Sequence, residues 1–327
     1  MKEIFKYSCL IFLHSLAGTY IATCFAIDLK IQGYEERVIG FGLSFWGIGV
    51  IIGAIFHNLI RKKFNLISTI FLGSLIQLLF SLIFLFDINI YLVALMQLIA
   101  GISNAVNSLT IESFISDKFK KSSGFYISLF WSSAGLGAIT ASLIIAINGI
   151  NNLTYYFAVL FYILHFIPIF IFRKSFIKIY IENITLRLSK DNLNKIKYLL
   201  ICVILFGACD AGFSTLFPSY LLEESFKDTQ IGQINFLAGS IALFFYPFMG
   251  KLVDKYNKTI IFNTICIINL TNLIALYFIN DFYLYIIFVA FYYYTIGTVF
   301  LITFNIVGKI LSGGAITFGI AGHYISE

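Results

Sequence analysis

The chain has 327 residues, of which 60% are hydrophobic and 12% are charged, and its mean hydropathy is +0.92. Soluble domains carry roughly 25% charged residues, so this composition excludes a water-soluble protein and indicates a membrane protein. The net charge of +6 comes from cations at the ends of apolar runs. We therefore expect the lipid bilayer, and no nucleic acid, among the partners of this chain.

Ten apolar runs follow one another along the chain. They cover residues 4–27, 38–60, 64–86, 88–114, 124–147, 153–172, 198–222, 230–250, 259–279 and 282–307. Since a helix needs about 20 apolar residues to cross a bilayer, each run predicts one transmembrane helix. The expected fold class is all-α, a polytopic transmembrane helical bundle. The apolar segment 313–327 has only 15 residues, which is too short for an ordinary span.

The distribution of Lys and Arg predicts the orientation of the chain. With the N-terminus in the cytoplasm, 19 of the 22 cations fall in cytoplasmic segments, and Lys30, Arg37 and Lys227 fall outside. Cytoplasmic loops retain positive charge. The richness in Ile, Phe, Tyr, Asn and Lys is typical of an AT-rich bacterial coding sequence, so we expect a multi-pass protein of the cell inner membrane with a cytoplasmic N-terminus.

A polar stretch at residues 173–197 divides the chain into two parts. It follows an expected bundle of six helices over residues 1–172 and precedes a second bundle over residues 198–327, which has four full spans and a partial one. Apolar residues alternate with cations in the stretch. This pattern is typical either of a helix on the inner membrane surface or of a solvated cytoplasmic linker.

Matching glycines indicate that the second bundle repeats the first. The pairs are Gly18 and Gly212, 194 residues apart, Gly40 and Gly232, 192 apart, and Gly53 and Gly250, 197 apart. Loop insertions produce such small changes of offset. We therefore expect two pseudo-symmetric six-helix halves, the second of them incomplete.

A short charged turn separates apolar runs at a similar place in both halves. The residues are Gly250, Asp254, Lys255 and Lys258 in the second half and Gly53, Arg61 and Lys62 in the first, where His57 stands in place of the acid. The second set resembles the Gly-x-x-x-Asp-Arg/Lys-x-Gly-Arg-Arg/Lys signature of the major facilitator superfamily, found after the second and eighth helices. The resemblance to this family extends over essentially the whole chain.

The resemblance implies a secondary active transporter that moves a small solute across the inner membrane by alternating access. It also implies that Asp254 helps to hold the two halves in the outward-facing arrangement, the alternative being a charge that solubilises the loop. Glu112 is expected in the same gating network, and the run Glu112-Ser113-Phe114 is similar to the YcaD-like bacterial subgroup. Many members carry an Arg linked to proton coupling where this chain has Gln97.

Asp210 is the sharpest functional candidate, because it is ionisable and lies in the middle of an apolar run. We expect a proton or cation site, or a ligand for a positively charged substrate; the alternative is a protonated acid bonded inside the bundle. His14 is also mid-span and is a candidate for proton exchange. Gln97, Asn104 and Asn107 either contact the substrate or bind neighbouring helices.

The expected function is transport of a small-molecule substrate, with protons as the candidate coupling ion and with the direction, efflux or uptake, left open. We expect neither a cofactor nor enzymatic activity, because the chain has no His-Glu-x-x-His motif and no Gly-x-x-x-x-Gly-Lys-Ser/Thr loop. Two alternatives remain at this point. One is a membrane receptor or assembly factor without transport, and the other is a nonfunctional truncated transporter.

Overall fold

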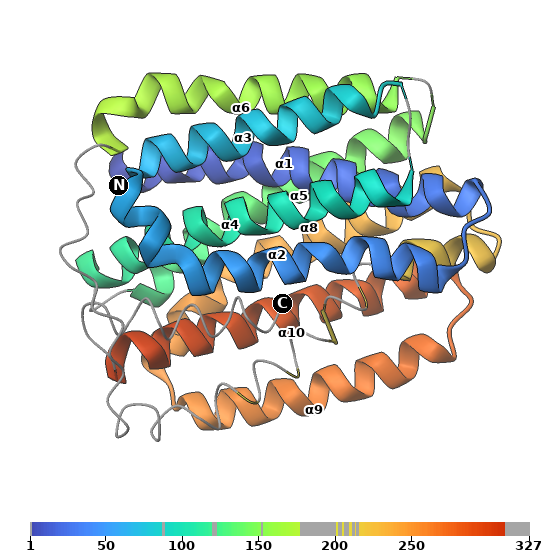
Figure 1. Ribbon diagram of the computed structural model, residues 1–327. Helices are drawn as coiled ribbons and strands as arrows, with labels where there is room; N and C mark the ends of the chain where they lie inside the picture. The colour runs from blue at the N-terminus through green and yellow to red at the C-terminus, as the bar shows by residue number, and fades with distance from the viewer. Residues whose placement is uncertain are drawn as a thin grey trace.

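The computed structural model describes residues 2–86, 89–119, 123–151, 153–176, 201, 205, 209–210, 213 and 216–310. The long helices are α1 (Lys2–Ile31), α2 (Glu36–Lys63), α3 (Leu66–Ile83), α4 (Ile90–Lys118), α5 (Ser123–Asn148), α6 (Thr154–Phe176), α8 (Asp228–Lys255), α9 (Lys258–Tyr277) and α10 (Phe282–Ile310). They lie side by side in one bundle (Figure 1). Regular secondary structure in the described residues is entirely helical, so the all-α prediction is confirmed.

Eight of these helices are long and apolar enough to cross a membrane, namely α1, α2, α4, α5, α6, α8, α9 and α10. The apolar part of α3, Ile67–Ile83, is shorter. Together they account for nine of the ten expected spans. The remaining run, 198–222, is described only in part and is helical where described. Most of the expected linker and the segment 313–327 lie outside the described residues, while α6 continues to Phe176.

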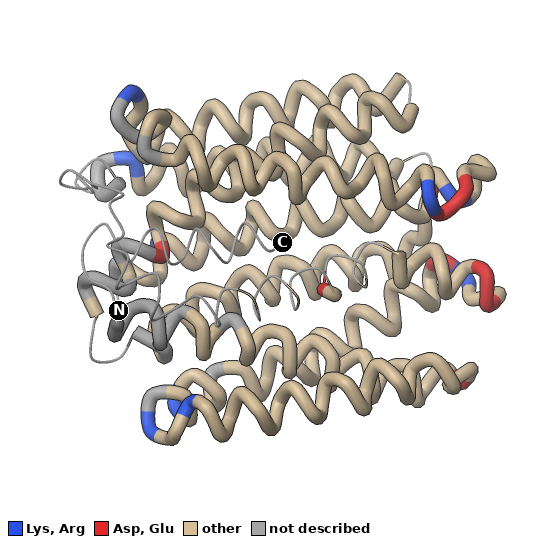
Figure 2. The backbone as a smooth tube through the Cα atoms, turned by 60° about the horizontal axis from the view of Figure 1, so that its bottom comes forward, with Lys and Arg blue, Asp and Glu red and all other residues tan. Residues whose placement is uncertain are grey.

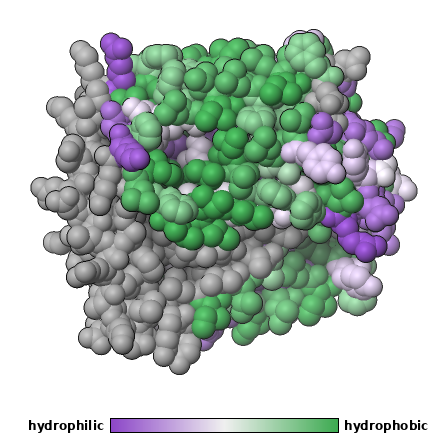
Figure 3. Space-filling model, viewed as in Figure 1, coloured by the Kyte–Doolittle hydropathy of each residue, from purple (hydrophilic) through white to green (hydrophobic). Residues whose placement is uncertain are grey.

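The outer surface of the bundle is apolar along most of its length (Figure 3). Large hydrophobic side chains point outward, among them Phe244, Ile267 and Phe278, with 68%, 65% and 76% of their area exposed. Charged residues lie mainly at the two ends of the bundle (Figure 2). Water would penalise such a surface, whereas lipid tails are as apolar as these side chains. The helices therefore present a belt that fits the hydrocarbon core of a bilayer.

The second half repeats the first at one constant offset. Helices α2 and α8 begin 192 residues apart and end 192 residues apart, and the same holds for α4 and α10. The turns agree as well, since the residues with positive φ are Gly33 (+87°) before α2 and Ser225 (+66°) before α8. These two positions are again separated by 192. The expected pseudo-symmetry is therefore present in the described helices.

The constant offset corrects two of the expected pairings. At 192 residues Gly250 corresponds to Asn58 and not to Gly53, so the pairing of the two glycines at 197 is out of register by more than one helical turn. Asp210 corresponds to Gly18, whereas the Gly18 and Gly212 pairing at 194 would place it opposite Leu16. The loops are short in both halves, so the charged motif residues lie on the helices themselves.

Asparagine caps explain where these helices begin. The Asn65 side chain accepts a hydrogen bond from the Ser68 backbone N–H (2.8 Å), and Asn257 does the same for Thr259 (2.9 Å). Such caps satisfy one of the free N–H groups at a helix start. Cations in the last turns of α2 and α8 are compatible with continued helix because they face its negative end. The turns expected over residues 53–63 and 250–258 therefore shrink to two-residue loops.

Close helix contacts depend on glycine. A Cβ at Gly101 on α4 would lie 2.1 Å from the backbone oxygen of Trp46 on α2. A Cβ at Gly232 on α8 would lie 2.5 Å from the backbone nitrogen of Ala146 on α5. These contacts bring the helix backbones together, as small residues do in membrane helices. The contact between α5 and α8 joins the two halves of the molecule.

Candidate functional site

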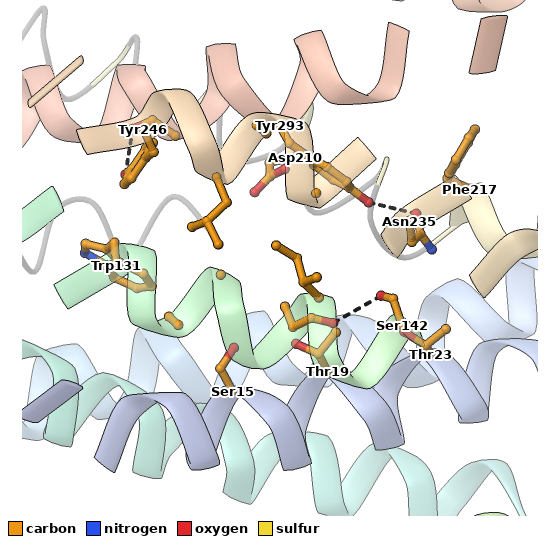
Figure 4. Close-up of a pocket in the computed structure, with 18 of the residues that line it drawn as sticks. Ser15, Thr19, Thr23, Trp131, Ser142, Asp210, Phe217, Asn235, Tyr246 and Tyr293 are labelled. Carbon is orange, nitrogen blue, oxygen red and sulfur yellow. Dashed lines mark hydrogen bonds between the residues drawn. The ribbon is translucent and has the colours of Figure 1, made fainter. Parts of the chain in front are cut away.

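A cavity of about 410 Å³ lies between the two halves. Its walls come from α1 and α5 on one side and from α8, α10 and the partly described helix through Asp210 on the other (Figure 4). The polar lining residues are Ser15, Thr19, Thr23, Trp131, Ser142, Asp210, Asn235, Tyr246 and Tyr293. Small-molecule sites are commonly 300 to 1,000 Å³ in size, roughly. The position between pseudo-symmetric halves is where transporters of this architecture bind substrate.

One face of α1 supplies hydroxyl groups. Ser15, Thr19 and Thr23 are spaced four residues apart, so they lie above one another along the helix. Figure 4 shows all three on the side of α1 that borders the cavity. A hydroxyl both donates and accepts hydrogen bonds. This wall can therefore bind either donors or acceptors of a polar solute.

Asp210 is the only acidic residue among the described residues that line the cavity. Its carboxylate accepts a hydrogen bond of 3.1 Å from the hydroxyl of Tyr292 on α10. The Tyr292 ring is fully buried and lies 4.1 Å, between ring centres, from Phe213. Tyr292 is thus fixed by packing and holds one carboxylate oxygen from behind. Asp210 itself is partly exposed, so it faces the cavity with a constrained geometry.

Aromatic side chains complete the cavity wall. The Tyr293 hydroxyl donates to the Asn235 side-chain oxygen (3.0 Å), which Figure 4 shows as a dashed line. The Tyr246 hydroxyl donates to the Gly297 backbone oxygen (3.0 Å). The indole nitrogen of Trp131 is buried without a hydrogen-bond partner in the described part of the chain. A buried N–H normally has a partner, so this donor is suited to an acceptor atom of a ligand.

The cavity contains a negative charge and no described cation. Lys and Arg do not occur among its described lining residues, and its remaining polar groups are hydroxyls, one amide, an indole and phenols. Such a lining attracts positive charge and hydrogen-bonding groups, whereas an anion would meet an uncompensated carboxylate. The aromatic rings add surfaces on which flat or cationic groups can stack.

A second polar cluster lies within the first half, away from the cavity. The rings of His14 on α1 and His165 on α6 have centres 5.3 Å apart and are tilted by 50°. His14 is hydrogen-bonded to Asn104 on α4, and His165 Nδ1 lies 3.0 Å from Ser74 Oγ on α3. Four helices therefore meet at one uncharged polar group of side chains. Neither histidine lines the cavity.

The other expected contact residues of α4 also lie away from the cavity lining. Gln97 is buried, with 6% of its area exposed. Asn107 donates to Ser103 Oγ on its own helix (3.3 Å). Glu112 is fully buried and interacts electrostatically with Tyr246 of α8. Of the five coupling candidates, the structure brings His14 and Asn104 together, places Asp210 in the cavity, and leaves Gln97 and Asn107 apart from both.

The motif residues occupy the ends of α2, α8 and α9. Gly53 lies in α2, where a Cβ would be 2.7 Å from the Ile102 backbone oxygen of α4. Gly250 is a buried residue of α8. The helix bounds place Arg61 and Lys62 in the last turn of α2, Asp254 and Lys255 in the last turn of α8, and Lys258 at the first residue of α9. Helix packing alone explains a glycine at position 53.

At the opposite end of the bundle, polar contacts join the two halves. Lys30 at the end of α1 forms ion pairs with Glu36 of α2 and with Glu223, and the second pair is 2.6 Å long. The carboxylate of Asp228 at the start of α8 accepts a hydrogen bond from the Ile150 backbone N–H (2.7 Å). The bundle is therefore tied together at the end that carries most of its acids.

Sequence reasoning missed most of the cavity residues. Tyr292, Tyr293 and Asn235 lie among many similar side chains, and their spacing carries no separate signal. The hydroxyl face of α1 is detectable in principle, because Ser15, Thr19 and Thr23 recur every four residues in an apolar run. His165 gave little signal alone, since only the fold brings it beside His14.

Comparisons with known proteins agree with this architecture. The family model described as Major Facilitator Superfamily matches residues 7–324, and no curated protein matches. The chain is similar to the crystal structure of the nucleoside transporter NupG, with a TM-score of 0.71, 13% identity and coverage of 100% of this chain and 89% of that one.

Two further solved structures are similar. The human organic anion transporter MFSD10 (TETRAN) has a TM-score of 0.71 at 13% identity, covering 99% of this chain and 90% of that one. A bacterial homolog of the human lysosomal transporter Spinster, in an inward-facing and unoccupied conformation, has a TM-score of 0.66 at 12% identity, with 99% and 78% covered. At these identities the likeness concerns the fold.

Proposed function

The chain belongs to the major facilitator superfamily, whose members are secondary transporters working by alternating access, and we propose that its substrate binds in the cavity at Asp210. The observation that carries the proposal is the partly exposed carboxylate at the interface of the two halves, fixed by Tyr292. A charge inside a membrane bundle is costly and is retained where it has a function.

The proposed substrate is a small polar solute that is neutral or positively charged. Its donors would bind Asp210 and the hydroxyls of α1, and a flat group would stack on the aromatic wall. The cavity is less suited to an organic anion, the substrate class named for MFSD10, because no described Lys or Arg lines it. The nucleoside transporter offers a precedent for a neutral solute.

We further propose that the two bundles, residues 1–172 and 198–327, rock about this cavity in the inner membrane, with residues 173–197 and the N-terminus in the cytoplasm. The end of the bundle with Lys6, Lys63 and Lys255 would then be cytoplasmic, and the end with Glu223 and Asp228 would face outward. Asp254 and Glu112 would act at the cytoplasmic end, where a gating network must form and break.

Counterflow in proteoliposomes tests this function. Vesicles loaded with unlabelled uridine, tetraethylammonium or benzoate would be diluted into the labelled compound, so that a neutral, a cationic and an anionic probe are compared. We expect exchange of the neutral or cationic probe and none of benzoate. Benzoate exchange alone would contradict the proposed substrate class. Absence of all exchange across a wider panel would favour a receptor, an assembly factor or a nonfunctional chain.

A further inference from the structure

We propose that His14 and His165 bind one proton between them and that this proton, and not one on Asp210, couples transport to a proton gradient. The inference rests on the proposed transport function for its coupling part and on geometry for the proton site itself. It extends the expectation for His14 by assigning a partner, an acceptor atom and a second site separate from the substrate cavity.

Hydrogen-bond accounting gives the protonation of His165. The Ser74 hydroxyl donates its single hydrogen to the Ile70 backbone oxygen (2.8 Å), so it must accept at its contact with His165 Nδ1 (3.0 Å). His165 is therefore protonated at Nδ1, and its Nε2 carries a lone pair. Nε2 is buried and has no hydrogen-bond partner in the described part of the chain. A buried acceptor without a partner is a ready proton acceptor.

The distance to His14 suits a shared proton. Two imidazoles joined by an N–H···N bond of about 2.9 Å have ring centres about 5 Å apart, since each nitrogen lies roughly 1.1 Å from its ring centre. The observed separation is 5.3 Å. His14 is anchored to Asn104 on α4, so it is held on its far side. A small rotation of the rings would bring the His165 lone pair to a protonated His14.

No fixed charge competes for this proton nearby. The nearest charged residues along the contributing helices are each eight positions away: Lys6 from His14, Glu112 from Asn104 and Arg173 from His165. Eight residues of helix span about 12 Å. Helices α3 and α5 contain no charged residue, and α2 carries its charges in its first two and last three positions.

The other titratable groups on these helices are uncharged near neutral pH. Tyr162 lies one turn before His165 on α6, Cys9 and Tyr20 lie on α1, and Tyr126 lies near the start of α5. The remaining histidine of the surrounding helices, His57 on α2, contacts Thr110 (3.1 Å). The bound proton would thus be the only charge in the middle of the first half.

Helix α1 links this site to the cavity. His14 belongs to the histidine pair, and the next residue, Ser15, lines the cavity. Successive residues of a helix are turned by about 100°, so one helix presents the proton site on one side and the substrate wall on another. Protonation that moves α1 against α4 and α6 would therefore alter the hydroxyl face that meets the substrate.

The test uses the full chain with His14→Gln, His165→Gln and the double variant, and His57→Gln as the matched control. Ring ¹⁵N signals of labelled histidine would be followed from about pH 8 to pH 5. In the wild type we expect the two rings to take up a single proton together. Each single variant should abolish this shared event, and the control should keep it. Two rings that stay neutral throughout, or that titrate independently, would overturn the site.

Transport in the same vesicles tests the coupling. One coupled proton per cycle lets a gradient of one pH unit change the equilibrium distribution of the transported probe about tenfold. We expect His14→Gln and His165→Gln to abolish this gradient effect but keep uridine or tetraethylammonium counterflow, with the double variant no worse than either. A full gradient effect in both variants would refute coupling. Shared titration without any wild-type flux would refute the proposed function and leave the proton site standing.

Discussion

Replacing Asp210 with Asn removes the charge from the cavity while preserving the shape of the side chain. Hydrogen bonds to a charged group contribute about 1.5 to 3 kcal/mol, which corresponds to a change in affinity of about tenfold to a hundredfold. The carboxylate is partly exposed and is held at 3.1 Å by Tyr292. We therefore expect the apparent affinity for a cationic probe to fall within this range, and that for a neutral probe to fall less.

Two further variants separate charge from structure. Tyr292→Phe keeps the carboxylate and removes its hydrogen bond, so we expect a smaller loss than for Asp210→Asn. Asp281→Asn makes the same chemical change at the start of α10, where the carboxylate caps the backbone N–H groups of Tyr283 and Leu284 (2.9 and 3.0 Å). This control should lower thermal stability by about 1 kcal/mol and leave affinity unchanged.

Counterflow at several tetraethylammonium and uridine concentrations gives the affinities, with thermal unfolding measured alongside. Wild-type affinity for every transported probe in Asp210→Asn would refute the argument and would make Asp210 a structural residue. Equal losses in Asp210→Asn and Asp281→Asn would likewise refute it, because the effect would then follow helix stability and not the cavity charge.

Three other predictions concern packing, the acidic end and orientation. Gly101→Ala places a methyl group against the backbone of α2 and should destabilise the protein by about 1 to 3 kcal/mol, whereas Gly18→Ala, with open space around the new Cβ, should not; thermal unfolding compares them, and equal effects would contradict the packing account. Lys30→Met removes ion pairs between the halves and should raise amide exchange at the outer ends of α1 and α8 by up to about fivefold, the scale of a surface ion pair; unchanged exchange would show that these pairs do not hold the end closed. In a cysteine-free background, cysteines at Glu224 and Tyr256 should react with an impermeant thiol reagent from opposite sides; labelling from one side would refute the topology.

Hydropathy was sufficient to predict the helices of the described chain. Apolar runs of about 20 residues can satisfy their backbone in lipid only as helices, so nine runs led directly to nine observed helices. The repeat was also detectable, but its register was not. Glycines such as Gly53 recur for local packing reasons, so matching them gave an offset of 197, and only the helix bounds fix the value at 192.

The site was predictable only where chemistry and depth coincided. Asp210 stands out because a carboxyl in the middle of an apolar run is rare, and the structure places it in the cavity. The pairing of His14 with His165 depends on helices distant in sequence, and no single-helix pattern contains it. Gln97 and Asn107 show the converse, since polar residues at the right depth on α4 serve contacts within the first half.

The correspondence of Asp210 with Gly18 has a mechanical consequence. The two repeats share their helix layout, but at this position one carries a carboxylate and the other a residue whose missing side chain leaves nothing within 4 Å of its Cβ position. A solute bound through Asp210 would stay fixed in the frame of the second repeat, while the hydroxyl face of α1 moves past it. The first repeat would therefore be the part that exchanges partners during each cycle, and the second would be the carrier.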